Sequence, residues 1–369
     1  MNRFEDKLLD FLKKHSPKGI FLVTGKKSFD LINKNISILR LLNGYNFKRF
    51  SDFEINPKIE DVKRGVDLFN SSDCDLIISI GGGSVMDMAK LINFYSKKIV
   101  SITNLNDDIT KKDLYPNLAI PTTAGSGSES THFAVVYSND KKYSCANLNL
   151  IPKETILEPN FLKSLSPYHL ACSGMDALSQ AIEAYWNVNS NTDSDKFALK
   201  AVELLWNNLP RTYKNKDNFK DIMQGSNLAG KAINITKTTA PHAVSYPFTT
   251  FFNIPHGHSV SLTLNYFLNY NYNLNEKDCN DKRGVKYVKN KIENLAKSLN
   301  FFDVRSFSFA LNNFINNLNL SVNLSELEIS KKQIIDYVIP NINYQRIKNN
   351  PRKINENELF SFLSKNTNK

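Results

Sequence analysis

The first part of the chain has short apolar runs separated by amphipathic segments. Four of the apolar runs have the length and composition of buried strands: residues 19–24, 46–50, 76–80 and 118–120. Amphipathic segments that begin at residue 28 and that cover residues 61–71 have the spacing of helices. Strands that alternate with helices in this way predict a parallel sheet with helices packed against it.

The pattern changes near residue 167. Beyond it, three segments have apolar residues at helical spacing over helical lengths: residues 168–188, 193–208 and 219–234. We therefore expect two domains. The first is an α/β nucleotide-binding domain over residues 1–162, with a Rossmann-like parallel sheet, and the second is an all-α domain over residues 163–369.

A glycine-rich turn follows the apolar run 76–80 directly. It consists of Gly81, Gly82, Gly83 and Ser84, and an amphipathic helix comes after it. Glycine lets the backbone turn sharply and come close to a ligand, and a helix begins with unpaired N–H groups and a partial positive charge. This combination is typical of a pyrophosphate site, although a tight structural turn is the alternative.

A second turn, residues 121–129, follows the run 118–120 and is rich in small polar residues. Its hydroxyl groups include those of Thr122, Thr123 and Ser126. On neighbouring strands of a parallel sheet, both turns would face one crevice at the carboxyl ends of the strands. The glycine spacing differs from G-x-G-x-x-G, so the common dinucleotide fingerprint is absent.

At this point the chain resembles the iron-containing alcohol dehydrogenases. Four motifs carry the resemblance, in order along residues 19–264: the turn 81–84 with Asp87 and Lys90, residues 121–129, residues 176–185, and His242 followed by His256 in Ile-Pro-His-Gly. The resemblance implies a dehydroquinate synthase-like fold and NAD(P)H-dependent reduction of an aldehyde. It also implies a set of nucleotide-binding residues: Ser51, Gly82, Gly83, Ser84, Asp87, Thr122, Thr123, Ser126 and Lys142.

The family's metal ligands are one aspartate and three histidines, and this chain matches them with one exception. Asp176, His242 and His256 correspond to three of the ligands, whereas Gln180 occupies the position of the remaining histidine. A glutamine amide oxygen is a weaker donor than imidazole for Fe²⁺ or Zn²⁺. We expect a divalent metal at these four residues, but Gln180 leaves metal-free chemistry open.

The hydride would come from the nicotinamide, and the growing alkoxide must be stabilised. A bound cation would polarise the carbonyl group as a Lewis acid. Without a metal, a side chain would have to donate a proton or a hydrogen bond instead. The candidates are His256, His258 and Tyr246, and Tyr246 stands where the family often has another histidine. His258 is also a possible substitute ligand.

The choice between NADH and NADPH depends on the end of the second strand, where a carboxylate would bind the ribose and repel a 2′-phosphate. The resemblance places this position near Ser51, which is uncharged, with Lys48 and Arg49 close in sequence. NADPH is therefore slightly favoured. Asp52 lies one residue away and keeps NADH open.

The segment before His242 suggests an anionic substrate. The family usually has small apolar residues there, often Gly-Leu-Gly, whereas this chain has Lys237 among threonines, and Lys231 lies on the preceding helix. Charge-assisted hydrogen bonds from lysine suit phosphate-like oxygens, although a solvated helix end is the plain alternative. The motifs look most like the phosphonoacetaldehyde reductase branch, which forms 2-hydroxyethylphosphonate. A general alcohol dehydrogenase for neutral aldehydes or diols, and a dehydroquinate synthase-like cyclase, remain as alternatives.

Composition is consistent with a cytoplasmic enzyme. Hydrophobic residues make up 41% of the chain, and the net charge is +11, but the lysines are dispersed and do not indicate nucleic-acid binding. The charged N-terminus lacks the apolar core of a signal peptide, and the apolar runs are shorter than a membrane span. The scattered cysteines indicate reduced thiols. We also expect a homo-oligomer, in particular a dimer.

Overall fold

The computed structural model describes residues 4–96, 114–138, 141–365 and 367. The chain divides into two compact units, Met1–Leu165 and Ser166–Lys369. The sequence analysis expected the division after residue 162. Each unit has its own internal packing and its own group of candidate functional residues.

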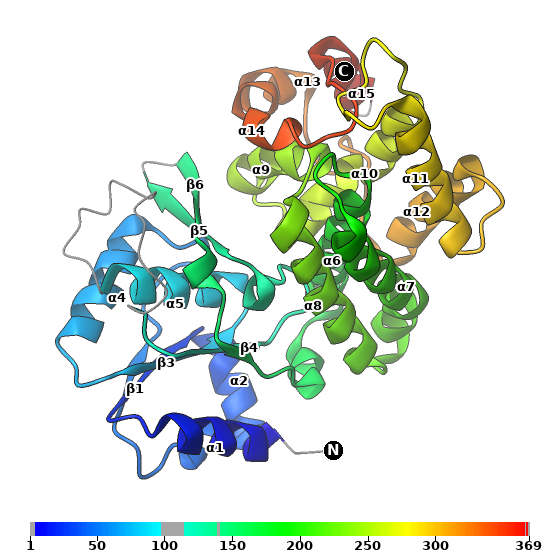
Figure 1. The fold of residues 1–369 in the computed structure, drawn as a ribbon. Coiled ribbons are helices and arrows are strands. Elements are labelled where there is room, and N and C mark those ends of the chain that lie inside the picture. Colours follow the sequence, from blue (N-terminus) through cyan, green and yellow to red (C-terminus); the bar gives the residue numbers. More distant parts are fainter. Residues whose placement is uncertain (1–3, 97–113, 139–140, 366, 368–369) are drawn as a thin grey trace. The chain divides into compact units, whose positions relative to one another are not determined.

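A five-stranded parallel sheet forms the centre of the first unit, in the order β2-β1-β3-β4-β7 (Figure 1). All neighbouring strands in it are parallel. The bounds are β1 (Ile20–Thr24), β2 (Phe47–Phe50), β3 (Leu76–Gly81), β4 (Asn117–Pro121) and β7 (Glu154–Thr155). The four predicted apolar runs therefore form four of the strands, which confirms the predicted parallel α/β arrangement.

Helices cover both faces of this sheet, and side chains alternate between the faces as the pleat requires. Ile20 and Leu22 pack with one group of helices, whereas Phe21 and Val23 pack with the other. The first group is α1 (Phe4–His15), α2 (Lys27–Ile36) and α3 (Ile38–Leu41), and the second is α4 (Ile59–Asn70) and α5 (Gly83–Ser96). Burial of each large apolar side chain contributes about 1.5–3 kcal/mol, so both faces stabilise the sheet that carries the two turns.

The sequence analysis did not anticipate an antiparallel hairpin, which follows the second turn. It consists of β5 (Phe133–Ser138) and β6 (Lys141–Ala146), and Ala134, Val136 and Cys145 face the helices of the α4–α5 side. The 3₁₀ elements η2 (Ser128–Ser130) and η3 (Leu148–Leu150) flank it, and η4 (Pro159–Ser164) follows β7. The alternation of buried and half-buried residues in β5 is the period of two that a half-buried strand predicts.

The second unit is helical, as predicted. Its long helices are α6 (Pro167–Trp186), α7 (Thr192–Asn215), α8 (Phe219–Thr236), α9 (Ala240–Phe252), α10 (His256–Tyr272), α11 (Val285–Ser298) and α12 (Val304–Asn317). Shorter elements follow: α13 (Lys331–Gln333), η5 (Ile334–Val338), η6 (Ile339–Asn341), α14 (Tyr344–Ile347) and α15 (Glu356–Lys365). An isolated bridge pairs Cys279 with Arg352.

Helix α7 extends further than the predicted segment 193–208, because it continues through Pro210 to Asn215. Proline removes one backbone donor from a helix, and this loss is tolerated where packing holds the rest. The buried Leu209 provides such packing, since a β-carbon on Gly174 of α6 would come within 2.4 Å of its side chain. The small residue on α6 therefore allows α6 and α7 to approach closely.

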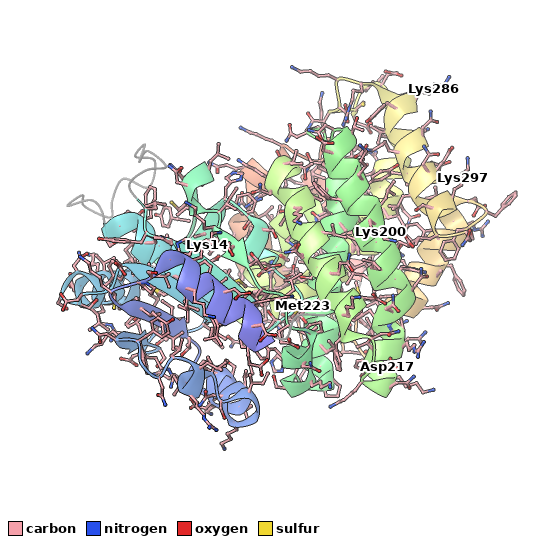
Figure 2. The ribbon with its side chains drawn as sticks, turned by 60° about the horizontal axis from the view of Figure 1, so that its bottom comes forward. Lys14, Lys200, Asp217, Met223, Lys286 and Lys297 are labelled. Carbon is pink, nitrogen blue, oxygen red and sulfur yellow. The ribbon has the colours of Figure 1, made fainter. Side chains whose placement is uncertain are left out.

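Figure 2 labels exposed lysines on α1, α7 and α11: Lys14, Lys200, Lys286 and Lys297. No disulfide joins Cys74, Cys145, Cys172 and Cys279, all of which lie in the described ranges. Each helix in those ranges falls short of the length or the apolar character that a membrane span requires.

Candidate active site

The two predicted turns lie side by side at the carboxyl edge of the sheet. Gly81, the last residue of β3, pairs with Pro121, the last residue of β4. Thr122 donates its backbone N–H to the Gly81 carbonyl over 2.9 Å. Helix α5 starts at Gly83, so its unpaired N–H groups and positive dipole end lie beside both turns. This geometry suits a pyrophosphate.

The glycines of the first turn also make room for the second turn. A β-carbon on Gly82 would lie 3.3 Å from the Thr123 side chain, and one on Gly83 would lie 2.6 Å from Ser126 Oγ. Thr123 and Ser126 are half-buried, whereas Thr122 is buried. A side chain at Gly83 would therefore displace the hydroxyl of Ser126 before it met a ligand.

Asp87 and the buried Lys90 connect α5 to the segment after the second turn. Asp87 accepts hydrogen bonds from Ser128 Oγ at 2.6 Å and from the Val135 backbone N–H at 2.9 Å. The Lys90 ammonium donates to Ser128 Oγ at 2.8 Å and to the Thr131 carbonyl at 2.9 Å. Burial lowers the pKa of Lys90 to about 8, although the neighbouring carboxylates oppose this effect. Both residues thus support the turn, and a direct nucleotide contact by Asp87 stays a prediction.

The remaining predicted nucleotide residues come from three different segments. Ser84 Oγ accepts a hydrogen bond from the Asn56 backbone N–H over 3.2 Å. Lys142 lies in β6 opposite Tyr137, and Ser51 directly follows β2. Their contacts with a nucleotide stay predictions.

Two cations surround the carboxylate next to Ser51. Asp52 lies 2.7 Å from Lys26 Nζ and 3.4 Å from Arg64 Nη1. The hydrogen bond and charge of Lys26, with a further contribution from Arg64, lower the pKa of Asp52. Arg49, which the sequence places nearby, donates instead to Thr24 Oγ1 at 2.9 Å. The positive charges at the end of β2 are therefore Lys26 and Arg64, which the sequence analysis did not identify.

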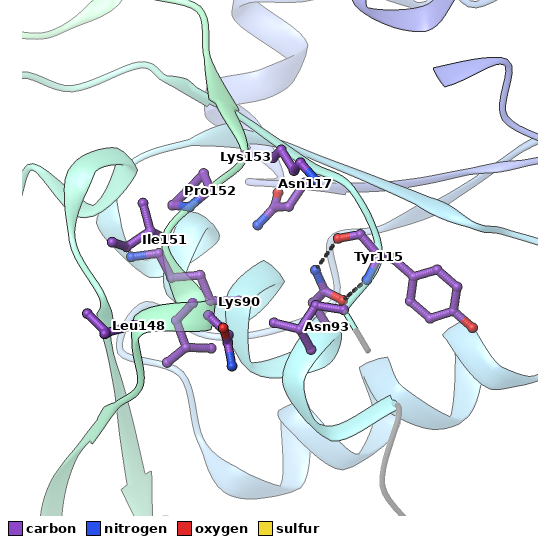
Figure 3. Close-up of a pocket in the computed structure, with 11 residues that line it drawn as sticks. Lys90, Asn93, Tyr115, Asn117, Leu148, Ile151, Pro152 and Lys153 are labelled. Atoms are coloured by element: carbon purple, nitrogen blue, oxygen red, sulfur yellow. Dashed lines mark hydrogen bonds between the residues drawn. The ribbon is translucent and has the colours of Figure 1, made fainter. Parts of the chain in front are cut away.

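A separate pocket of about 240 Å³ lies at the other end of β4, where the strand begins (Figure 3). Asn93 and Tyr115 on its wall exchange two hydrogen bonds, at 2.9 and 3.0 Å. Asn117, the first residue of β4, and Lys153 also line it. The residues predicted to bind the nucleotide do not line this pocket.

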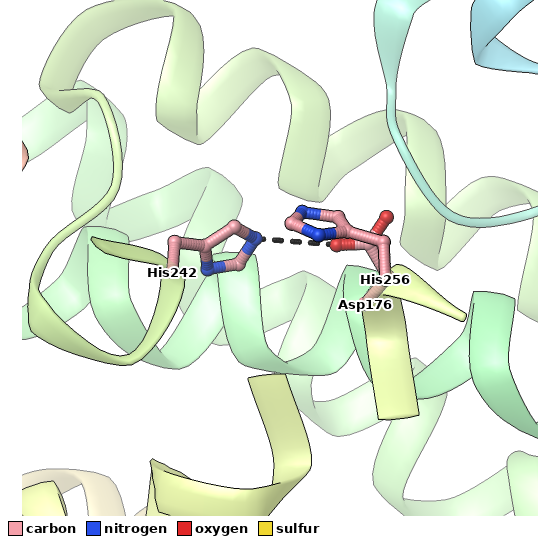
Figure 4. A group of neighbouring side chains, drawn as sticks. All are labelled: Asp176, His242 and His256. Atoms are coloured by element: carbon pink, nitrogen blue, oxygen red, sulfur yellow. Dashed lines mark hydrogen bonds and ion pairs between the residues drawn. The ribbon is translucent and has the colours of Figure 1, made fainter. Parts of the chain in front are cut away.

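In the second unit, three predicted metal ligands come together (Figure 4). Asp176 lies on α6, His242 in the first turn of α9, and His256 at the start of α10. One ligand atom of each lies within 4.8 Å of the others. His242 Nε2 is 3.2 Å from Asp176 Oδ1. Residues far apart in sequence therefore converge on one point, and they are of the types that bind Fe²⁺ and Zn²⁺.

Gln180 lies one turn after Asp176 on the same face of α6. Its Nε2 donates to Asp176 Oδ1 over 3.1 Å. Its Oε1 is buried and has no hydrogen-bond partner among the described residues. A buried carbonyl oxygen without a partner is unfavourable, and a cation would satisfy it. The residues present therefore fit a divalent metal bound by Asp176, His242, His256 and the amide oxygen of Gln180.

The sequence analysis missed the role of Glu183 in this region. Glu183 is fully buried, and its carboxylate accepts hydrogen bonds from His242 Nδ1 and from the N–H and hydroxyl of Thr239. Trp186 Nε1 donates to the same Thr239 hydroxyl over 3.0 Å. The signal was available, because position 183 falls on the same face of α6 as Asp176 and Gln180.

The charges in this group are strongly coupled. Burial alone would lower the pKa of His242, but Glu183 and Asp176 outweigh this effect and raise it to about 10. Burial alone would raise the pKa of Asp176, but the hydrogen bond and charge of His242 and the charge of His256 lower it. Without a metal, His242 is therefore a cation at neutral pH.

His258 lies in a different hydrogen-bond network. Its Nε2 is 2.6 Å from the Ser321 carbonyl oxygen, and its Nδ1 is 3.0 Å from the Tyr168 hydroxyl. A carbonyl only accepts, so Nε2 carries the hydrogen and Nδ1 accepts from Tyr168. Burial lowers the pKa of His258, which favours this neutral form. The structure does not group His258 with the candidate ligands Asp176, His242 and His256, so it gives no support to a substitute-ligand role, and the catalytic role of His258 stays a prediction.

Tyr246, by contrast, lies beside that group. It follows His242 by one turn of α9, and its ring stacks on that of His256 with centroids 5.7 Å apart and an interplanar angle of 12°. The residue is partly exposed. A hydroxyl group next to a candidate metal ligand can donate a proton, and the catalytic role of Tyr246 stays a prediction.

Residues 237–239, between α8 and α9, form a turn that we call the lysine turn, and its backbone is unusual. Lys237 has φ 64° and ψ −174°, a combination that is nearly restricted to glycine. Hydrogen bonds from Thr236 Oγ1 and Asn187 Nδ2 hold its carbonyl oxygen. Its side chain is exposed, as is that of Lys231 on α8. Neither lysine is among the grouped metal ligands.

The C-terminal region also contributes to this turn. Arg346 Nη1 lies 3.4 Å from the hydroxyl of buried Thr238, and Asn349 Nδ2 donates to the Thr238 carbonyl over 3.0 Å. The Asn343 backbone N–H donates to the Ala243 carbonyl over 3.2 Å. No motif in the sequence connects Arg346 with the lysine turn.

Comparisons with known proteins agree with both halves of this geometry. The sequence pattern of "Iron-containing alcohol dehydrogenase" matches residues 4–159, and that of "Fe-containing alcohol dehydrogenase family, C-terminal" matches residues 170–367. Long-chain-alcohol dehydrogenase 1 of Geobacillus thermodenitrificans is 32% identical over 275 residues, which are 72% of this chain and 69% of that protein. The chain spans about a third of the length of the aldehyde-alcohol dehydrogenases that it also matches.

Two further similarities concern reductases of acidic aldehydes. Phosphonoacetaldehyde reductase of Streptomyces viridochromogenes is 28% identical over 309 residues, which are 78% of this chain and 75% of that protein. The crystal structure of sulfoacetaldehyde reductase from Bifidobacterium kashiwanohense in complex with NAD⁺ is 27% identical, with a TM-score of 0.86 and coverage of 98% and 94%. The chain belongs to the iron-containing alcohol dehydrogenase family, whose members are NAD(P)-dependent alcohol dehydrogenases and aldehyde reductases.

Proposed function

We propose that this protein uses NADPH to reduce a small aldehyde with an acidic group to a primary alcohol. The specific reaction is phosphonoacetaldehyde to 2-hydroxyethylphosphonate. The observation that carries the proposal is that a lysine and a candidate metal ligand lie close together on one short segment of the chain. The strained turn at Lys237 leads directly through Thr239 to His242, which lies 3.2 Å from Asp176. A cationic turn and a metal-binding histidine are thus five residues apart.

Each candidate residue has a defined part in this reaction. The turn of Gly82 and Gly83, at the start of α5, binds the pyrophosphate, with hydroxyl groups from Thr122, Thr123 and Ser126. When bound, the nicotinamide supplies the hydride and the cation polarises the carbonyl group. Asp176, Gln180, His242 and His256 hold the cation. Tyr246, partly exposed and stacked on His256, donates the proton to the alcohol oxygen.

The acidic group of the substrate requires donors near the reacting carbonyl. Lys237 supplies an ammonium, and Arg346, next to Thr238, supplies a guanidinium that can bind two oxygens at once. Lys231 on α8 adds positive charge. The two relatives named for acidic aldehydes, phosphonoacetaldehyde and sulfoacetaldehyde, support this substrate class.

The preference for NADPH rests on the end of β2. Ser51 has no charge to repel a 2′-phosphate, and Asp52 is already paired with Lys26 and Arg64. Both cations would attract a 2′-phosphate, which carries more negative charge than the ribose hydroxyl of NADH. These residues together favour NADPH.

A general alcohol dehydrogenase for neutral substrates is the second candidate. The 32% identity to long-chain-alcohol dehydrogenase 1 favours it, because that value exceeds the identity to phosphonoacetaldehyde reductase. The cyclase alternative has no comparable support, since the matched family patterns are those of alcohol dehydrogenases.

A substrate panel tests the proposal. Oxidation of NADPH and NADH would be followed with phosphonoacetaldehyde, sulfoacetaldehyde, propanal and butanal, and the same preparation would be analysed for metal. We expect kcat/KM for phosphonoacetaldehyde to exceed that for propanal by roughly 10- to 150-fold, the value of one charged hydrogen bond. Higher kcat/KM for the neutral aldehydes would replace the acidic substrate with the general alcohol dehydrogenase.

A further inference from the structure

Glu183 is a fully buried carboxylate that is hydrogen-bonded to Thr239 and His242, on the segment before and at the start of α9. Its Oε2 accepts from the Thr239 backbone N–H at 2.7 Å and from the Thr239 hydroxyl at 2.9 Å, and its Oε1 contacts His242 Nδ1. A buried carboxylate is costly unless such partners satisfy it. Here the partners are the last residue before α9 and a metal ligand in the first turn of α9.

The contact with His242 determines which ring nitrogen is available to a metal. A carboxylate accepts, so Nδ1 carries the hydrogen and donates it to Glu183. The other nitrogen, Nε2, points toward Asp176 Oδ1 at 3.2 Å. A metal-binding imidazole needs one unprotonated nitrogen. The hydrogen bond that one ring nitrogen donates keeps the proton there and leaves the other nitrogen for the metal. Glu183 therefore selects Nε2.

The same carboxylate also holds the start of α9. Within the described chain, the Thr239 side chain makes no capping hydrogen bond to this helix, and its own N–H is bound by Glu183 instead. Negative charge near a helix N-terminus is favourable because of the helix dipole. One side chain on α6 thus fixes both the beginning of α9 and the ring orientation of His242.

We propose that Glu183 is a positioning residue that holds His242 as an Nε2 ligand for a divalent cation. This inference rests on the metal centre of the proposed function. Glu183 would strengthen the binding of the cation by His242. This matters because Gln180 supplies only a neutral amide oxygen. Loss of a carboxylate behind a metal-binding histidine weakens metal affinity by roughly 10- to 100-fold.

Chelator competition with Zn²⁺ on the full chain tests this role with Glu183→Gln, Thr239→Val and Asp281→Asn. Glu183→Gln should weaken Zn²⁺ binding by roughly 10- to 100-fold. Asp281→Asn is the matched control, because Asp281 is also a buried carboxylate of the second unit but pairs with Arg283. It should stay within about threefold of wild type, and so should Thr239→Val, which keeps the contact between Glu183 and His242.

The results separate this inference from the metal centre. A wild-type protein that binds no Zn²⁺ would overturn both. If the wild-type protein binds Zn²⁺ and Glu183→Gln binds it with the same affinity, the inference alone is overturned. An equal loss of affinity in Thr239→Val would also overturn it, because the effect would then come from the packing of the start of α9.

A second measurement needs no variant, and so it holds even if Glu183→Gln fails to fold. Long-range ¹H–¹⁵N spectra of histidine-labelled, Zn²⁺-loaded protein should show His242 with a protonated Nδ1 and a metal-bound Nε2. Metal bound at Nδ1 would overturn the proposal.

Discussion

Gly257 lies against Cys172 so closely that a β-carbon on Gly257 would be 1.8 Å from the Cys172 carbonyl oxygen. The same β-carbon would lie 2.9 Å from the β-carbon of Asp176. Gly257 directly follows His256, and both His256 and Asp176 are proposed metal ligands. The absence of a side chain at this position therefore allows α10 to approach α6 and brings these two proposed ligands together.

Gly257→Ala should accordingly destabilise the second unit and weaken metal binding together. The obstacle is backbone, which cannot move aside as a side chain can, so we expect a loss of at least about 1–3 kcal/mol in the free energy of unfolding. Gly25→Ala is the control, because the nearest atom there is the movable hydroxyl of Ser28. Denaturant melts with Zn²⁺ titrations would measure both effects. Equal stability of the two variants would contradict the close approach.

Zn²⁺ binding should release protons near neutral pH. In the metal-free protein the pKa of His242 is raised to about 10 by Glu183 and Asp176, against the effect of burial. Below that pH a metal must displace the Nε2 proton, so affinity should rise with pH, by up to about tenfold per pH unit, and level off above it. Calorimetry in buffers of different ionisation enthalpy would detect about one released proton per Zn²⁺ at pH 7.5. Binding without proton release would contradict a charged His242.

The same pKa predicts how the stability of the metal-free protein depends on pH. The folded chain holds the His242 proton more tightly than the unfolded chain, where the pKa is near 6.5. The stabilising contribution is therefore complete below about pH 6.5 and decreases as the pH rises toward 10. Urea titrations of chelator-treated protein should show this decrease, and His242→Gln should reduce it. A pH-independent difference between the two proteins would argue against it.

Local sequence signals predicted those parts of the fold and site that depend on neighbours in sequence. The apolar runs that became β1 and β3 and the glycine turn before α5 were readable in this way. His242 and His256 were found from the family's order of motifs, and the structure groups them with Asp176. Their roles as ligands stay predictions.

Features that depend on distant segments were not readable. Position 183 shares a face of α6 with Asp176 and Gln180, but its hydrogen bonds with Thr239 and His242, which lie more than fifty residues further along the chain, could not be read from the sequence. Arg346 acquires its position from α14, which follows His242 by about a hundred residues of chain without a motif. The continuation of α7 beyond Pro210 likewise depends on the packing of Leu209 against Gly174.

Gly83→Val should weaken nucleotide binding by at least about tenfold while the unit stays folded. A β-carbon at Gly83 would lie 2.6 Å from Ser126 Oγ, so the clash between turns is one possible cause. Gly83→Val combined with Ser126→Gly removes that clash, and Ser126→Gly alone is its reference, because Ser126 is itself a proposed nucleotide-binding residue. We expect the double variant to bind more weakly than Ser126→Gly, because the valine still occupies the space of the pyrophosphate. Fluorescence titration with NADPH would measure this, and recovery in the double variant would show that the turn contact alone matters.

Cofactor preference should respond to the end of β2. Ser51→Asp introduces a carboxylate that repels a 2′-phosphate, so kcat/KM for NADPH should fall by at least about tenfold relative to NADH. Lys26→Ala should act in the same direction, because Lys26 supplies positive charge 2.7 Å from Asp52. Lys14→Ala, an exposed lysine on α1 that pairs with Glu154, is the control. Steady-state rates with both cofactors would measure these ratios, and unchanged ratios would remove these residues from the 2′-phosphate site.

Lys237 offers a test that separates substrate recognition from backbone strain. Its φ of 64° and ψ of −174° suit glycine, so Lys237→Gly should relieve strain of about 1 kcal/mol or more and raise the melting temperature. Lys237→Ala keeps the strain and removes the side chain beyond the β-carbon, including its ammonium. Both variants should lose roughly 10- to 150-fold in kcat/KM for phosphonoacetaldehyde and little for propanal. Equal losses on both aldehydes would assign the lysine a structural role. A glycine variant that is no more stable than the alanine variant would refute the strain at this turn.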